Sequence, residues 1–321
     1  MSSGRLDELL GSWESVQPQP ERRAIPSRMA DSNASAPEYV LGTGADELER
    51  LGFQARLWAD AAHALWRRAR IGPGQHVLDV GCGPGHASFD LAMLVTRRGR
   101  VVGIDESPNF VQHANAQAAA RNLPQLTAVR GDGHDIPAAL ASLSNSPPVP
   151  GAQSPAPPFD LAYARWVLCF VRDPAAVVRS VASVLKPGAF FAVHDYFNYE
   201  TMTCAPRRDI YTRVVAATAR SWRDRGGDPD VAGRLPAMLD AAGFDVVHMD
   251  VHQRTARPGD TMWHWPDTWW RTYTPKLLQM GYITRQDHDE MLATLDDLCR
   301  SKTDFVVCPP VFEILAVKRP G

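Results

Sequence analysis

Short apolar runs, separated by stretches with helical spacing, recur along most of this 321-residue chain. The runs are rich in Val, Leu and Ile, which is typical of strands buried on both faces of a sheet. The expected strands are 77–80, 100–105, 126–130, 159–163, 189–193, 244–251 and 311–318. The expected helices are 46–69, 87–94, 136–143, 173–185, 206–223, 229–242, 261–280 and 284–302. This alternation predicts an α/β fold built on a doubly wound sheet.

Two segments lack this periodicity. Residues 1–37 mix Ser, Pro, Gln and charged residues, which predicts a flexible leader. The alternative is a lid that orders over bound substrate. Residues 144–158 are dominated by Ser, Pro and Gly, and we expect them to form a surface insertion between the third and fourth strands. The rest of the chain, residues 38–321, is expected to fold as one domain.

The composition bears on whether the chain binds nucleic acids, membranes or metals, and on the compartment in which it works. The formal net charge is −2, so the chain lacks the basic excess that drives binding to a nucleic-acid backbone. No apolar run approaches the length of a bilayer span, and the N-terminus carries acids and no apolar signal region. The five cysteines are scattered and lack zinc-ligand spacing, so we expect free thiols and no metal. Together these features predict a cytoplasmic monomer or homodimer that does not bind membranes.

The strongest chemical signal is the stretch D-V-G-C-G-P-G-H at residues 79–86, directly after the first expected strand. Glycine adopts positive φ readily and has no Cβ, so a ligand can approach the backbone closely. In α/β proteins, a loop of this kind at the carboxyl end of a strand binds nucleotide-like ligands. A nicotinamide-dependent oxidoreductase would carry G-x-G-x-x-G, but here His86 occupies the third glycine position. That enzyme class is therefore a less favoured alternative.

Residues 79–85 resemble motif I, D-x-G-x-G-x-G, of the class I S-adenosylmethionine (AdoMet)-dependent methyltransferases. Further matches follow in the order of that family: an acid at Asp105, the turn 131–133, a motif IV-like strand at 159–163 and the turn and strand at 185–193. The resemblance covers roughly residues 39–200 well and the remainder loosely. It implies a Rossmann-like, seven-stranded sheet of order 3-2-1-4-5-7-6 with an antiparallel seventh strand. It also implies AdoMet as the cofactor.

The same resemblance implies that helical insertions cap the site and set substrate choice. The two expected cap segments are residues 200–230 and 261–303. An aromatic cluster lies in the second of them, and it is either part of a core or the wall of a small-molecule pocket. Its members are Trp263, His264, Trp265, Trp269, Trp270 and Tyr273.

Acidic residues at the ends of the first three strands are the main candidates for cofactor contacts. Asp79 is expected to face the methionine amino group or to order the glycine loop. An acid at Asp105 can accept hydrogen bonds from both ribose hydroxyls, and Glu106 can assist there. The resemblance implies that the Asp132 position contacts the adenine amino group.

Three further candidates lie outside these strand ends. Arg165, just past the fourth strand, either reaches the methionine carboxylate or forms a surface ion pair. The stretches 39–42 and 50–54 resemble the N-terminal segment that covers the cofactor in one branch of the family, which makes Tyr39 and Gln54 candidate cofactor contacts. The alternative is that these side chains only pack a helix. The complete candidate cofactor set is Tyr39, Gln54, Asp79, Gly81, Gly83, Gly85, Asp105, Glu106, Asp132, Gly133 and Arg165.

Methyl transfer from a sulfonium is an in-line displacement, so the protein must mainly align the nucleophile, exclude water and, where needed, remove a proton. His194, at the end of the fifth expected strand, is the candidate general base because imidazole titrates near neutrality. Asp195 is expected to orient it or to act as the base itself. A purely structural histidine is the alternative.

The sequence therefore predicts an AdoMet-dependent methyltransferase that acts on a small organic acceptor. We expect O-methylation first and N- or C-methylation second. Two alternatives remain open: an AdoMet-binding protein without catalysis, and an RNA methyltransferase, for which the composition provides no basic face.

Overall fold

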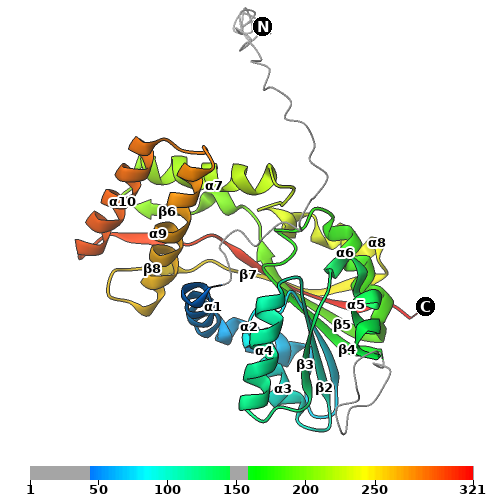
Figure 1. Ribbon diagram of the computed structural model, residues 1–321. Coiled ribbons are helices and arrows are strands. Elements are labelled where there is room, and N and C mark those ends of the chain that lie inside the picture. Colours follow the sequence, from blue (N-terminus) through cyan, green and yellow to red (C-terminus); the bar gives the residue numbers. More distant parts are fainter. Residues whose placement is uncertain (1–43, 145–157, 321) are drawn as a thin grey trace, which may run out of the picture. The chain divides into compact units, whose positions relative to one another are not determined.

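The computed structural model describes residues 44–144 and 158–320. Within these residues a seven-stranded sheet has the order β3-β2-β1-β4-β5-β10-β7 (Figure 1). Its strands are β1 His76–Val80, β2 Arg100–Asp105, β3 Leu126–Arg130, β4 Phe159–Arg165, β5 Leu185–Tyr196, β7 Phe244–His252 and β10 Val311–Lys318. The first five pair in parallel, whereas β10 is antiparallel to both β5 and β7. This confirms the expected order and the antiparallel last strand.

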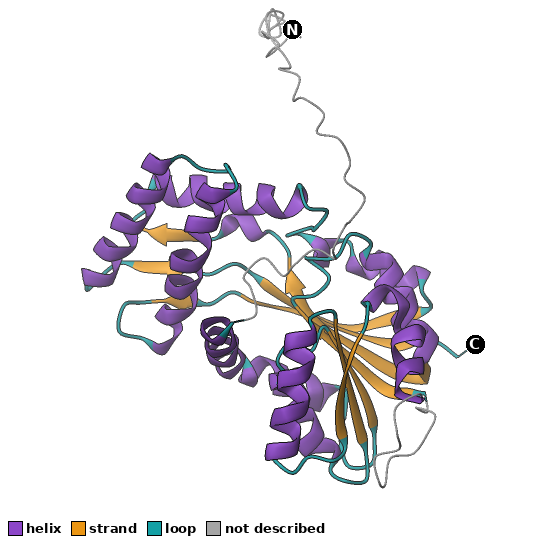
Figure 2. Ribbon diagram, viewed as in Figure 1, coloured by secondary structure: helices purple, strands orange, loops and turns teal. Residues whose placement is uncertain are grey.

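Helices cover both faces of this sheet because successive strand residues point to opposite faces (Figure 2). Val77 belongs to one core cluster, with the apolar residues of α2, α3 and α4. The next residue, Leu78, belongs to a second cluster that includes residues of α5, α6 and α8. These helices are α2 Ala59–Arg68, α3 His86–Val95, α4 Pro108–Ala120, α5 Ile136–Ser144, α6 Pro174–Val184 and α8 Leu235–Ala241. The carboxyl ends of β1, β2 and β3 therefore open between two helical layers.

A second group of elements is formed by segments that are inserted after β5 and after β7. It contains α7 Asp209–Arg223, α9 His264–Gln279 and α10 Arg285–Arg300, which pack on one another. Beside them lies a small antiparallel sheet of order β6-β9-β8, made of Thr203–Ala205, Phe305–Val307 and Thr255–Ala256. This sheet was not expected from the sequence, because strands of two or three residues are too short to show a period.

Several expected helices are shorter or divided. The helix expected at 46–69 is two helices, α1 Ala45–Leu57 and α2, separated at Trp58. The Leu57 carbonyl accepts a hydrogen bond from the Arg254 side chain at 2.7 Å, a contact between distant segments that a local pattern cannot reveal. The helix expected at 229–242 is a 3-10 turn, Val231–Gly233, followed by α8.

The leader and nearly all of the Pro-rich insertion lie outside the described residues. Among the helices that the structure describes, none has the length and apolar character needed to cross a bilayer.

Candidate functional site

The glycine loop after β1 has three positions that suit glycine far better than any other residue. Gly81, Gly83 and Gly85 have φ values of +64°, +54° and +92°. A Cβ at Gly81 would lie 2.4 Å from Val167 Cγ2, and one at Gly85 would lie 3.0 Å from Ala114 Cβ. A Cβ at Gly83 would meet no atom within 4 Å. Two glycines thus allow close packing, while Gly83 exposes bare backbone to open space, where a ligand can approach it.

Asp105 connects the end of β2 to this loop. One carboxylate oxygen accepts the Gly83 N–H at 2.8 Å, and the other accepts the Ser107 N–H at 2.9 Å. Burial raises the pKa of Asp105, although the two backbone donors counteract part of this effect. Ser107 also caps α4, since its hydroxyl accepts the Phe110 N–H at 3.3 Å. The acid expected at the ribose therefore lies against the glycine loop after β1.

Asp79 lies at the centre of the sheet and is 2% exposed. Its carboxylate accepts a hydrogen bond from the Ser88 hydroxyl at 2.5 Å, which connects β1 to the first turn of α3. Burial raises the pKa of Asp79 to about 6, and the nearby Arg165 counteracts part of this effect. Two roles were expected for Asp79, and the contact with Ser88 supports the second of them, which is to order the glycine loop.

The remaining candidates from the strand ends lie at the same edge of the sheet. Asp132 caps the 3-10 turn Gly133–Asp135 after β3, and its carboxylate accepts the His134 N–H at 2.8 Å. The same oxygen also contacts the His134 ring nitrogen Nδ1 at 2.5 Å, and the Asp132 side chain is 55% exposed. Glu106 is exposed directly after Asp105, and its carbonyl accepts a hydrogen bond from Arg130 at 3.2 Å. The structure thus brings the candidates of β1, β2 and β3 to neighbouring loops.

The candidates from outside these loops contact aromatic and polar side chains of neighbouring elements. Gln54, on α1, uses its side-chain oxygen to accept hydrogen bonds from Arg50 and from the indole of Trp265, each at 3.1 Å. This contact joins α1 to α9. Arg165 ends β4, and its guanidinium lies 5.3 Å from the centre of the Trp166 ring. Tyr39 lies outside the described residues.

His194 and Asp195 project from opposite faces of β5, because they are consecutive residues of a strand. His194 is 1% exposed; its Nδ1 lies 3.3 Å from the Tyr163 hydroxyl and its Nε2 lies 3.4 Å from Glu313. Burial lowers the pKa of His194. Asp195 accepts the Cys169 and Tyr196 N–H groups at 3.2 and 2.9 Å, and burial raises its pKa to about 6.

The expected pairing of Asp195 with His194 is therefore not made, for the simple reason of strand alternation. The partners of His194 come instead from β4 and β10. Whether either residue takes part in catalysis stays a prediction. Glu313 was not among the residues expected at the site, although an isolated acid within the apolar run 311–317 was a signal that could have identified it.

An aromatic cluster lies where β4 and β5 end, and it comprises Trp58, Trp166, Tyr196 and Trp265. Trp166, the first residue after β4, has a φ of +54° and stacks on Tyr196 and Trp265 with centroid distances of 6.0 Å. The rings of Trp58 and Trp166 are nearly perpendicular, with a centroid distance of 5.4 Å. Among the described residues, the buried indole N–H groups of Trp58 and Trp166 have no hydrogen-bond partner.

Only Trp265 of this aromatic cluster belongs to the group expected in the cap segment 261–303. Two other members of that expected group are core residues: Trp270 donates to the Tyr211 hydroxyl at 2.7 Å, and Tyr273 is 1% exposed. Trp58 and Trp166 were not foreseen as site residues. The position of Trp166 directly after the motif IV-like strand was the available signal.

Comparisons with known proteins identify methyltransferases as relatives of this chain. Residues 71–222 match the family model described as a methyltransferase domain. A 2-phytyl-1,4-naphtoquinone methyltransferase from Synechococcus elongatus is 33% identical over 41% of this chain and 53% of its own length. An uncharacterized methyltransferase from Synechocystis is 30% identical over 57% of this chain and 72% of its own length. This chain thus spans about half the length of the quinone methyltransferase.

A solved structure from Bacillus halodurans, described as a methyltransferase, has a TM-score of 0.50 and 19% sequence identity. The match covers 81% of this chain and 99% of that protein, and at this identity it bears on the fold alone. The stretch matched by the family model includes the glycine loop, Asp105, Asp132 and Arg165.

Proposed function

Because this chain belongs to the class I AdoMet-dependent methyltransferases, we propose that it transfers a methyl group from AdoMet to a small organic acceptor. Oxygen is the proposed acceptor atom, with nitrogen or carbon as the second choice. The observation that carries the proposal is the loop of three left-handed glycines, in which Gly83 faces open space and its N–H is held by Asp105.

The residues present suit AdoMet. A Cβ at Gly83 would project into the open space beside Asp105, so the absence of a side chain leaves room for a ligand against the backbone. We propose that Asp105 and Glu106 hold the ribose and that Asp132 and Gly133 hold the adenine. Arg165 is the proposed partner of the methionine carboxylate, and Asp79, which is 2% exposed and bound to Ser88, is proposed to order the loop. When bound, AdoMet supplies a methyl group on a sulfonium, and attack on this methyl releases S-adenosylhomocysteine.

The proposed contribution of the protein is mainly alignment and the exclusion of water. His194 and Asp195 are each 1% exposed. The ring nitrogens of His194 contact Tyr163 and Glu313, and the carboxylate of Asp195 accepts the N–H groups of Cys169 and Tyr196. General-base catalysis by either residue would need a rearrangement that frees these atoms. For an acceptor that ionises on its own, such as an acidic hydroxyl, alignment alone is sufficient.

A flat, unsaturated acceptor suits the aromatic cluster best. Indole and phenol rings stack on planar molecules, and the N–H groups of Trp58 and Trp166 have no hydrogen-bond partner within the described part of the chain. Both N–H groups are buried, so the proposal requires the rings to move apart when an acceptor binds. The relative from Synechococcus elongatus is named for a naphthoquinone substrate, which is a molecule of this type. We therefore propose hydroxylated quinones and phenols as the first acceptor class.

Calorimetric titration with AdoMet, S-adenosylhomocysteine and NADH is the first test. Micromolar binding of the first two, without binding of NADH, is expected. If AdoMet does not bind, the proposal fails.

Transfer of a labelled methyl group is the second test, with hydroxynaphthoquinones, simple phenols, an aliphatic carboxylic acid and bulk tRNA as acceptors. Labelling of a quinone or phenol, with release of S-adenosylhomocysteine, is expected. Labelling of tRNA alone would favour an RNA methyltransferase. AdoMet binding without any transfer would favour a binding protein.

A further inference from the structure

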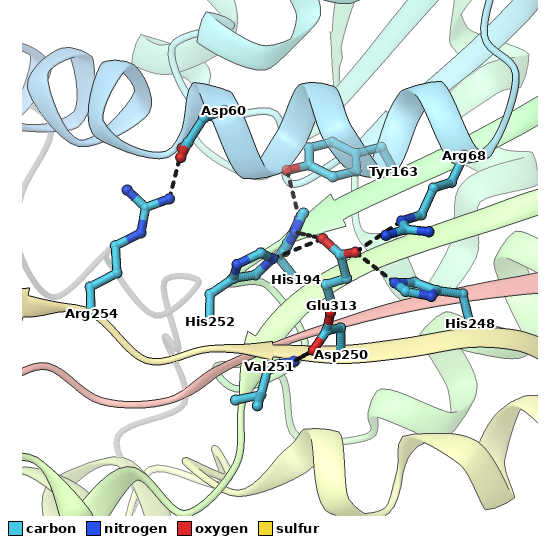
Figure 3. Close-up of polar contacts among 10 residues, drawn as sticks. All are labelled: Asp60, Arg68, Tyr163, His194, His248, Asp250, Val251, His252, Arg254 and Glu313. Atoms are coloured by element: carbon cyan, nitrogen blue, oxygen red, sulfur yellow. Dashed lines mark hydrogen bonds and ion pairs between the residues drawn. The ribbon is translucent and has the colours of Figure 1, made fainter.

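Three adjacent strands bring two histidines and a glutamate together on the face of the sheet that α2 covers (Figure 3). His194 comes from β5, Glu313 from β10 and His252 from the end of β7. Glu313 is the direct cross-strand partner of His194. We propose that His194, His252 and Glu313 form a binding site for a divalent transition-metal ion, with Zn²⁺ as the preferred ion.

The distances among the proposed ligand atoms suit one small ion. Glu313 Oε2 lies 3.4 Å from His194 Nε2 and 2.9 Å from His252 Nε2, and all three atoms lie within 4.8 Å of one another. A tetrahedral zinc ion with bonds of 2.0–2.1 Å separates its ligand atoms by about 3.3 Å. The His194–Glu313 distance already matches this value, and the His252–Glu313 distance needs only a small widening.

Neighbouring groups hold two of the proposed ligands in orientation. The buried Tyr163 hydroxyl lies 3.3 Å from His194 Nδ1, which leaves Nε2 directed at Glu313. His248 Nε2 lies 2.7 Å from the other carboxylate oxygen, Oε1. Metal-binding histidines and carboxylates in proteins are typically held by such outer contacts, which set the tautomer and the ring orientation.

Two of the proposed ligands are buried, and the third is partly exposed to solvent. His194 and Glu313 are 1% and 2% exposed, whereas His252 is 28% exposed and forms the outer side of the cluster. Arg68 Nε lies 3.6 Å from Glu313 Oε1, and its positive charge opposes a metal ion. The Arg68 side chain is 53% exposed, so it can turn toward solvent when an ion binds.

The ligand set selects the type of metal. Two imidazoles and one carboxylate are typical of catalytic Zn²⁺ sites and also of non-haem Fe²⁺ sites. Zn²⁺ is the preferred ion because it binds such ligands more tightly than Fe²⁺ does, and three protein ligands leave one coordination position for water. Mg²⁺ and Ca²⁺ prefer oxygen ligands and are not expected to bind. An ion here would clamp β5, β10 and β7 together at the side of the sheet where the strands turn antiparallel. The sequence offered no zinc spacing because each ligand lies on a different strand.

The test uses the full chain after chelator treatment, followed by calorimetric titration with ZnCl₂ and, separately, with MgCl₂. We expect one Zn²⁺ per chain at micromolar affinity or tighter, a higher melting temperature with Zn²⁺, and no binding of Mg²⁺. His252→Gln is the main variant, since the partly exposed side chain can be changed without opening the core. It is expected to weaken Zn²⁺ binding at least tenfold and to abolish the rise in melting temperature.

His63→Gln is the matched control, because His63 contacts the single carboxylate of Asp90 at the surface. It is expected to bind Zn²⁺ like the unaltered chain. The proposal is overturned if the folded chain binds no stoichiometric Zn²⁺, or if His252→Gln and His63→Gln bind it equally. Neither outcome depends on AdoMet binding, so the result is separate from that of the proposed methyltransferase activity.

Discussion

At the scale of single residues, the three loop glycines meet different physical demands. Gly81 and Gly85 are crowded by Val167, Ala114 and Phe89, whereas Gly83 faces open space. All three have positive φ, so any other residue is strained there. Replacing the crowded glycines tests packing, while replacing Gly83 tests the space that a ligand would use.

Gly83→Ala is expected to lower the free energy of unfolding by about 1 kcal/mol through backbone strain and to weaken AdoMet binding at least tenfold. The reason for the second effect is that the new methyl group enters the open space. Urea denaturation and calorimetric titration measure the two quantities. Gly188→Ala is the matched control, with a φ of +79° and no atom within 4 Å, near the amino end of β5. Equal AdoMet affinity in the two variants would contradict the assignment of this space to the cofactor.

Asp79 is expected to make stability depend on pH. Its pKa is about 6 in the folded chain and 3.8 for an ordinary aspartate, so the folded state holds this proton more tightly. Its stabilising contribution is full below pH 3.8 and is lost as the pH rises through about 6. The loss is on the order of 3 kcal/mol. Asp79→Asn stays neutral and should therefore reduce the difference in unfolding free energy between pH 4.5 and pH 7.5.

Asp297→Asn, at a carboxylate that is 64% exposed and pairs with Arg300, is the control for this pH effect and should leave the difference unchanged. Urea denaturation at both pH values provides the measurement. The same pH dependence in Asp79→Asn as in the unaltered chain would show that Asp79 does not retain its proton on folding.

At the scale of elements, Arg254 joins the segment after β7 to the junction of α1 and α2. It donates to the Leu57 carbonyl and to Asp60, each at 2.7 Å, and its guanidinium lies 4.3 Å from the centre of the Trp58 ring. Trp58 in turn belongs to the aromatic cluster. The break between the two helices is therefore coupled to the proposed acceptor site.

Arg254→Ala is expected to lower the free energy of unfolding by roughly 2 kcal/mol, because it removes two hydrogen bonds and a cation–π contact. Asp60→Ala should lower it by less than about 1 kcal/mol, since Asp60 is 72% exposed and the ion pair is weak. Chemical denaturation of both variants compares the two effects. Equal losses would mean that the ion pair, and not the Leu57 and Trp58 contacts, stabilises the junction.

At the scale of the whole molecule, the cofactor is expected to stabilise the fold it binds. S-adenosylhomocysteine at one hundred times its dissociation constant should raise the free energy of unfolding by about 2.7 kcal/mol. Thermal and urea unfolding with and without the ligand measure this increase. Gly83→Ala at the same ligand concentration should show a smaller increase. An unchanged transition in the unaltered chain would contradict cofactor binding to the native state.

The sequence by itself determined the features that neighbouring residues encode. The strand–glycine–helix pattern at 76–95 and the acids that end the first two strands are local, and the resemblance that they carry implied the observed strand order. Each depends on the alternation of side chains or on the backbone freedom of glycine, which act over a few residues.

Only the tertiary structure decided which distant side chains meet. Strand alternation already turns His194 and Asp195 to opposite faces, but only the sheet places His194 against Glu313, 119 residues away. Trp166 and Trp58 likewise join one aromatic cluster from different elements. Such contacts depend on strand register and helix packing across long stretches of chain, and no local period carries that information.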